Sequence, residues 1–220
     1  MASGVIFDMD GVLVLTENAH WLAWKAAADR RGVAIDYPTF LSCFGRVNPD
    51  CIRIMFGDAT PDAESARIAD EKEHAFREII KSDVPLAPGL IPLLDSLRAA
   101  NVPLAVGSSA PPENVDLVLD AGRIRPYFSA VVDGTQVARG KPAPDVFLRA
   151  GKLLGLAPAD CAVIEDAPAG ILAAKAAGML AIGVATTHKD HELLAAGADI
   201  VFPALADLSA PLLLNTDRAR

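Results

Sequence analysis

The sequence predicts an α/β fold, in which a parallel sheet is flanked by helices and a second, all-helical domain is inserted into the chain. Short apolar runs alternate with segments of helical periodicity along most of the sequence, a pattern typical of parallel sheets. This alternation stops between residues 17 and 85, where helical segments follow one another without a strand. The length of 220 residues suits one large domain, or a medium domain with a smaller one attached.

Strands are predicted where a run is short, apolar on both faces and bounded by Gly, Asp, Ser or Pro. Such runs cover residues 5–7, 104–106, 130–132, 162–164 and 181–184, and a sixth covers 200–202. Between them, apolar residues at helical spacing, as at Val115, Val118 and Leu119, predict the crossover helices of a parallel sheet.

Consecutive helices are expected in the insertion, covering about residues 17–31, 36–44, 48–56 and 61–81. Pro38 and Pro49 lie where two of them begin, a position that suits proline because the missing N–H has no helical partner there. We therefore predict a parallel-sheet core formed by residues 1–15 and 87–220, with a helical domain formed by residues 16–86.

Charge and composition exclude several functional classes. The formal net charge of −8 argues against a partner that is nucleic acid or an anionic membrane. No window approaches the roughly 20 apolar residues of a membrane-spanning helix, and we expect no signal peptide. The three cysteines show no close pairing, which favours reduced thiols in a cytoplasmic protein. An acidic enzyme can still bind an anionic substrate if its pocket holds a cation.

Polar groups follow the first two predicted strands. Asp8 and Asp10 come directly after the first, and Ser108 and Ser109 come after the second. Open α/β sheets bind ligands at the carboxyl ends of their strands, so these groups are expected to meet at one site. Two carboxylates this close repel each other, which calls for a cation or a shared proton. One can act as a nucleophile and the other as a general acid/base, as phosphoryl transfer requires.

Two further strand ends add to this set. Lys141, flanked by Gly and Pro, can neutralise a phosphoryl group, and Glu165 and Asp166 follow the fourth strand. Carboxylate oxygens from both acidic pairs suit Mg²⁺, a hard ion that also binds phosphate oxygens. Each group alone has a structural alternative: a turn for the first pair, helix capping for the serine and Asp166, a surface loop for the lysine. Their occurrence at four strand ends favours the catalytic interpretation.

In this order, Asp8-x-Asp10-Gly-Val-Leu, Ser108, Lys141-Pro and Glu165-Asp166 resemble the four motifs of the haloacid dehalogenase superfamily. The helical insertion resembles the α-helical cap of some members. The likeness extends over nearly the whole chain to the branch that holds β-phosphoglucomutases and sugar-phosphate phosphatases. This resemblance implies a Rossmann-like core, Mg²⁺ as cofactor and a small phosphorylated substrate. We expect a monomer or a weak homodimer.

The resemblance also implies a role for each motif residue. Asp8 attacks phosphorus and becomes an aspartyl phosphate, while Asp10 protonates the leaving oxygen and then activates the acceptor. Ser108 and Lys141 hold the transferring phosphoryl group. The implied metal ligands are Asp8, the backbone carbonyl of Asp10 and Asp166, with Glu165 as a ligand or as a neighbour of the ligands.

Residues of the helical insertion are expected to select the substrate. His20 and Lys72 match positions that the mutases of this branch use in their cap, although each could instead lie on a solvated helix face. Arg46 is a further candidate to bind the substrate, because it could replace, from a different angle, an arginine that these mutases carry just after the cap glycine. At the edge of the sheet, Ser109 completes the candidate substrate-binding residues.

Two departures from the mutases favour a phosphatase. Asn48 stands where these mutases carry an arginine, and Ala110-Pro111 replaces a Ser-Lys pair that grips the second phosphate. We therefore predict a Mg²⁺-dependent phosphatase that acts on a small phosphorylated metabolite through an aspartyl phosphate, and the resemblance implies a sugar phosphate as the substrate. The alternative is a β-phosphoglucomutase-type phosphomutase that interconverts hexose 1- and 6-phosphates. A signalling receiver domain fits less well, because receivers are shorter and lack an inserted helical domain.

The sequence also leads to predictions for a hinge residue, two tryptophans and two histidines. Leu15 stands where the branch usually has an aspartate, which affects the hydrogen bonding of the hinge into the insertion. Trp21 and Trp24 are expected to pack against the next helix of the insertion. His188 and His191 have metal-like spacing, but a solvated loop that enters a helix explains them better.

Overall fold

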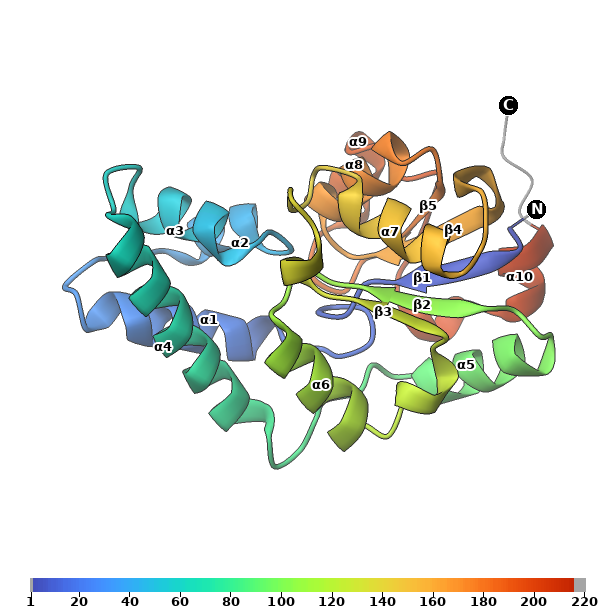
Figure 1. The fold of residues 1–220 in the computed structure, drawn as a ribbon, viewed down its shortest axis with the longest axis horizontal. Coiled ribbons are helices and arrows are strands. Elements are labelled where there is room, and N and C mark those ends of the chain that lie inside the picture. Colours follow the sequence, from blue (N-terminus) through green and yellow to red (C-terminus); the bar gives the residue numbers. More distant parts are fainter. Residues whose placement is uncertain (1, 216–220) are drawn as a thin grey trace.

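The computed structural model describes residues 2–215, and Figure 1 shows an elongated molecule with a sheet-containing part and a helical part. Within these residues, six parallel strands form one sheet in the order β3-β2-β1-β4-β5-β6. The strands are β1 Gly4–Phe7, β2 Leu104–Gly107, β3 Ala130–Val132, β4 Cys161–Glu165, β5 Leu180–Val184 and β6 Ile200–Phe202. This arrangement confirms the predicted α/β class, and each strand lies within one residue of its predicted position.

The order of the strands determines where a ligand can bind. β1 lies in the middle of the sheet, between β2 and β4, so the chain winds outward from it in both directions. In open α/β sheets, ligands bind at such a switch point, beyond the carboxyl ends of the strands. The loops after β1 and β4 therefore hold the best-placed residues for a site.

Helices cover both faces of the sheet (Figure 1). They are α5 Leu90–Ala99, α6 Pro112–Ala121 and α10 Ala210–Asn215 on one face, and α7 Asp145–Leu153, α8 Pro168–Ala176 and α9 Asp190–Ala195 on the other. Side chains of β1 alternate between the two hydrophobic cores, with Val5 and Phe7 in one and Ile6 in the other. Short 3₁₀ helices at Arg125–Tyr127, Gly134–Gln136, Pro158–Asp160 and Leu205–Asp207 complete the connections.

The helical part, at the left of Figure 1, contains the helices between β1 and α5. They are α1 Glu17–Asp29, α2 Tyr37–Cys43, α3 Asn48–Phe56 and α4 Asp62–Ile80, which we call the cap. The cap helices form where the sequence predicted them, within two residues. They share a hydrophobic cluster separate from the two sheet cores, which includes Trp24, Phe40 and Ile52. The exact domain bounds at residues 16 and 86 stay a prediction.

Two short segments connect the cap to the sheet. The backbone N–H of Leu15 donates to the carbonyl of Pro85 at 2.8 Å, and the N–H of Ala87 donates to Leu13 at 2.9 Å. The hinge is therefore held by backbone hydrogen bonds in which the Leu15 side chain takes no part, and this side chain is partly exposed.

Two expectations drawn from composition can be compared with the structure. Cys43, Cys51 and Cys161 are free thiols, as predicted, and all three are buried. Among residues 2–215, no helix has the length and apolar character needed to cross a membrane.

Candidate active site

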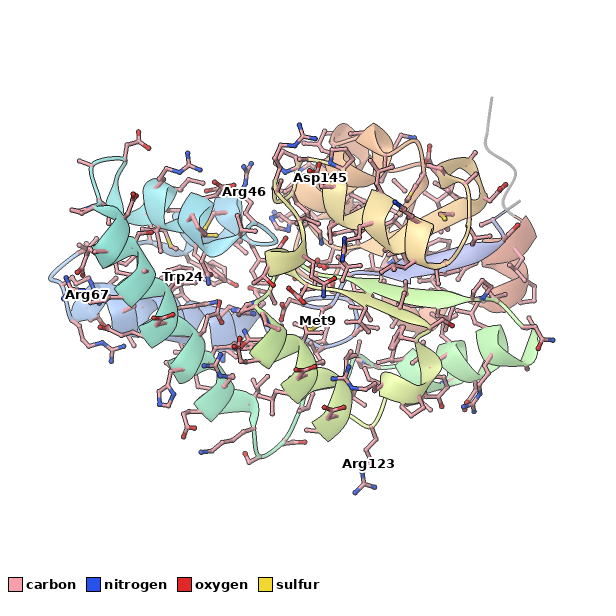
Figure 2. All side chains as sticks on the ribbon, viewed as in Figure 1. Met9, Trp24, Arg46, Arg67, Arg123 and Asp145 are labelled. Carbon is pink, nitrogen blue, oxygen red and sulfur yellow. The ribbon has the colours of Figure 1, made fainter. Side chains whose placement is uncertain are left out.

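A pocket lies between the carboxyl edge of the sheet and the cap. Asp8, Asp10, Ser108 and Ser109 line it from the sheet, and His20, Arg46 and Lys72 line it from the cap. In Figure 2, Trp24 and Arg46 are labelled on the cap, and Met9, between the two aspartates, is labelled on the sheet side. The pocket thus brings together seven side chains that the sequence singled out.

Lys141 lies at the centre of the charged network. Its Nζ donates to Oδ1 of Asp8 at 2.7 Å and to Oε1 of Glu165 at 2.6 Å, and the residue is only 1% exposed. Burial alone would lower the pKa of Lys141, but the two carboxylates raise it above its usual value. The surface-loop alternative for this residue is therefore wrong, since the lysine is a buried cation held against Asp8.

Asp8 is the buried carboxylate nearest to this cation. Burial and the Glu165 carboxylate raise the pKa of Asp8 to about 7, although Lys141 acts in the opposite direction. Because one ammonium faces two carboxylates, the network of Asp8, Glu165 and Lys141 retains an excess negative charge. A further cation would stabilise it.

Asp8, Glu165 and Asp166 form an acidic cluster, each offering an oxygen within 4.8 Å of the others. Both carboxylate oxygens of Asp166 are buried and have no hydrogen-bond partner among the described residues. Burial, followed by the Glu165 and Asp8 charges, raises the pKa of Asp166 well above its usual value. Unpartnered buried carboxylate oxygens are costly, and a hard divalent cation is the partner that suits them.

Glu165 differs from Asp166 in this respect. Its Oε1 accepts the hydrogen bond from Lys141, and its Oε2 accepts the backbone N–H groups of Asp166 and Ala167 at 2.9 and 3.0 Å. Glu165 therefore already orients Lys141 and the loop after β4. This geometry favours the role of a neighbour of the metal ligands over that of a ligand.

Asp10 is held by two residues at the start of the cap. Its Oδ1 accepts from the hydroxyl of Thr16 at 2.6 Å and lies 3.0 Å from Nε2 of His20. Burial acts to raise the pKa of Asp10, but His20 and Thr16 outweigh it, so the pKa is lowered. The sequence analysis gave Thr16 no part in the site, although its position between the Asp10 motif and α1 could have indicated one.

The two serines after β2 are used differently. Ser108 is buried, and its Oγ accepts from the backbone N–H of Ala110 at 3.0 Å. This contact leaves the Ser108 hydroxyl hydrogen available for a ligand. Ser109 donates its hydroxyl to the carbonyl of Gly45 in the cap at 2.9 Å. It therefore links the sheet to the cap, and only its oxygen lone pairs remain for a substrate.

His20 and Lys72 are both buried, which removes the alternative of a solvated helix face. The His20 ring stacks on Phe76 with ring centroids 3.9 Å apart. Lys72 Nζ lies 5.1 Å from the centroid of the Trp24 ring and donates to Oε1 of Glu73 at 2.8 Å. Glu73 also lines the pocket and was not among the predicted site residues.

Tryptophan packing agrees with the sequence expectation. Trp21 lies against Tyr37 and Phe40 of α2, with ring centroids 5.3 and 5.6 Å away. Trp24 is buried in the hydrophobic cluster of the cap and also forms part of the pocket wall. Arg46 follows α2, and its buried Nε has no hydrogen-bond partner within the described chain.

The expectation for His188 was wrong. This residue is only 7% exposed, with Nδ1 at 3.1 Å from the carbonyl oxygen of Asp166 and Nε2 at 3.2 Å from that of Leu41. The loop after β5 folds over the loop after β4 and reaches the cap, which buries this imidazole. His191, in contrast, lies in the exposed first turn of α9.

Comparisons with known proteins agree with this geometry. The family described as haloacid dehalogenase-like hydrolase matches residues 2–178. β-Phosphoglucomutase of Bacillus subtilis is 37% identical over 216 residues, which cover 95% of this chain and 92% of that protein. Fructose-1-phosphate phosphatase YqaB of Escherichia coli is 35% identical, covering 83% of this chain and 96% of its own.

A solved structure extends the likeness to three dimensions. The crystal structure of β-phosphoglucomutase from Clostridium difficile superposes with a TM-score of 0.88 at 28% identity, covering 97% of this chain and 96% of that one. The sequence matches, the order of the strands and the residues of the pocket thus agree on one family. The chain belongs to the haloacid dehalogenase-like hydrolase family, as an enzyme of the phosphatase or phosphomutase type.

Proposed function

We propose that this protein is a Mg²⁺-dependent phosphatase that hydrolyses a sugar phosphate or a similar small metabolite through an aspartyl phosphate on Asp8. The observation that carries the proposal is the contact of buried Lys141 with Asp8, beside the unpartnered carboxylate of Asp166. A nucleophile, a cation and an acidic cluster at one pocket are the groups that phosphoryl transfer from a monoester requires.

In the first step, an Asp8 oxygen forms a bond to phosphorus and the bond to the substrate's ester oxygen breaks. Lys141 and the Ser108 hydroxyl stabilise the charge on the transferring group. Asp10 transfers a proton to the leaving oxygen, and its carboxylate, the form that His20 and Thr16 stabilise, then takes a proton from the water that attacks phosphorus and breaks the bond to Asp8. Thr16 and His20 orient this carboxylate.

The residues present fit Mg²⁺. Asp8 and Asp166 would hold the ion through carboxylate oxygens, with the backbone carbonyl of Asp10 as a third ligand, and Glu165 would support them. The ion, when bound, offsets the charge of the acidic cluster and of the phosphoryl group. The unpartnered oxygens of Asp166 are the support for this assignment.

The second candidate is a phosphomutase, which the likeness to β-phosphoglucomutase of Bacillus subtilis favours. A mutase must hold a second phosphate at the cap end of the pocket. Asn48 and Ala110 offer no cation there, and the Asn48 amide is bonded to Glu73 at 2.8 Å. Of the two cations that line this end, Lys72 is paired with Glu73, which leaves Arg46 to bind a second phosphate, and this favours water as the phosphoryl acceptor.

Phosphate release from a panel of sugar phosphates tests the proposal. Wild type, Asp8→Asn and the surface variant Asp29→Asn would each be assayed with Mg²⁺ and with EDTA. We expect Mg²⁺-dependent release in wild type and Asp29→Asn, and none in Asp8→Asn. Conversion of β-glucose 1-phosphate to glucose 6-phosphate only after a bisphosphate is added, without phosphate release, would establish the mutase instead.

A further inference from the structure

Glu73 of α4 is a buried carboxylate in the cap wall of the pocket. Its side chain is 8% exposed and lies among the residues that line the cavity. Oε1 accepts hydrogen bonds from Lys72 and Asn48, both at 2.8 Å, and Oε2 accepts from Asn114 at 2.6 Å. The mechanism proposed above makes no use of this residue.

The neighbours of Glu73 keep it ionised. Burial alone would raise its pKa, but Lys72 and His20 facing it, with the hydrogen bonds from Lys72 and Asn48, lower the pKa below its usual value. The carboxylate therefore neutralises Lys72 inside the pocket. The lysine that the sequence singled out as a substrate ligand is not a free positive charge.

The charge balance of the cap end follows from this pair. Among the described residues that line the pocket, Arg46 and Lys72 carry a permanent positive charge. With Glu73 ionised, the three side chains together carry one positive charge. A phosphate monoester carries close to two negative charges at neutral pH. A second phosphate group of the same substrate, bound at the cap end, would lie next to the Glu73 carboxylate.

We propose that Glu73 determines the substrate class, so that the pocket takes monophosphates whose organic part is uncharged and hydroxylated, and disfavours bisphosphates. The inference rests on the phosphatase function proposed above. An ionised carboxylate has about four acceptor positions, and Lys72, Asn48 and Asn114 occupy three of them. The remaining position suits a hydroxyl group of the substrate, whereas a phosphate oxygen there would face like charge.

Glu73→Gln tests the proposal because it removes the charge and nearly preserves the volume. kcat/KM would be measured for glucose 1-phosphate, glucose 6-phosphate and fructose 1-phosphate, and for glucose 1,6-bisphosphate and fructose 1,6-bisphosphate. We expect wild type to prefer the monophosphates, and the preference to fall roughly tenfold in the variant, since like charges suppress unsuitable ligands. An unchanged preference would overturn the proposal.

Two control variants separate charge from structure. Glu78→Gln removes an exposed charge from the same helix, so the preference should stay as in wild type. Asn114→Ala removes the sheet-side partner of Glu73 but leaves its charge, so it should alter kcat/KM for both substrate classes by the same factor. An Asn114→Ala variant that loses the preference as Glu73→Gln does would show that the contact matters and the charge does not.

A binding measurement covers the case in which Glu73→Gln does not fold. Asp8→Asn protein with Mg²⁺ would be titrated by calorimetry with glucose 6-phosphate and with glucose 1,6-bisphosphate. We expect the bisphosphate to bind no more tightly than the monophosphate, and tenfold tighter binding would overturn the inference. If wild type hydrolyses nothing in the panel, the phosphatase proposal fails, while this titration still shows whether the pocket disfavours a second phosphate.

Discussion

Gly11 lies so close to Asp166 that a Cβ built on it would be 1.8 Å from the Oδ2 atom of that carboxylate. The backbone of Gly11 also has a φ of +82°, in the left-handed region that favours glycine. Its carbonyl accepts a hydrogen bond from Thr186 at 2.5 Å. The two acidic pairs of the site can approach each other because this residue has no side chain.

Gly11→Ala should therefore impair both folding and metal binding. The left-handed conformation costs an alanine about 1–2 kcal/mol, and the new methyl group must displace the Asp166 carboxylate. Gly32→Ala is the matched control, since Gly32 has a φ of +64° and nothing within 4 Å of its Cβ position. Urea unfolding should show a larger loss of stability for Gly11→Ala. Equal losses would mean that the contact with Asp166 has no effect.

Asp166→Asn should change how the protein responds to Mg²⁺. Without metal, the substitution removes a buried carboxyl group whose ionisation is opposed by burial, Glu165 and Asp8, so the variant should unfold at a higher temperature than wild type. Saturating Mg²⁺ should stabilise wild type, by about 2.7 kcal/mol at 100 times the Kd, and the variant much less. Thermal unfolding with and without Mg²⁺ measures both effects.

The exposed Asp160, at the other end of β4, provides the control for this experiment. Asp160→Asn should keep the wild-type response to Mg²⁺. If Asp166→Asn is stabilised by the metal as strongly as wild type, the ion does not bind to this carboxylate.

His188 and His191 form a natural pair for a test of burial. His188→Ala removes the imidazole that lies 3.1 Å from the carbonyl oxygen of Asp166 and 3.2 Å from that of Leu41, and a buried carbonyl that loses its donor costs about 1–3 kcal/mol. His191→Ala, on an exposed turn, should stay within about 0.5 kcal/mol of wild type. Chemical denaturation of both variants checks this, and a similar small effect for the two would contradict the bridging role of His188.

The fold could be predicted from the sequence because central parallel strands leave a local signal. Val5, Ile6 and Phe7 are all apolar since both faces of β1 are buried, and a run of this kind is visible without any structure. The motif residues after β1 and β4 were predicted for the same reason, since the carboxyl ends of parallel strands meet at one edge.

The cap wall of the pocket could not be predicted in the same way. Glu71, Lys72 and Glu73 are consecutive charged residues of α4, a pattern typical of a solvated helix face. Glu71 indeed pairs with Arg31 near the surface, whereas Lys72 and Glu73 point into the pocket. The difference depends on how α4 packs against α1 and the sheet part, which local periodicity does not encode.

The ionised state of Glu73 makes stability depend on pH. Its pKa is lowered in the folded protein from an ordinary value of 4.5, so its contribution is present above that value and is lost as the pH falls through the folded pKa. Lys72 on α4 and His20 on α1 face the side chain at this position in both wild type and Glu73→Gln. The difference in unfolding free energy between the two should therefore shrink below about pH 4.5. Urea unfolding at several pH values, with the exposed Glu113→Gln as control, measures this difference. A gap that widens in acid would mean that Glu73 is protonated in the folded protein, and the charge pairing with Lys72 would then be wrong.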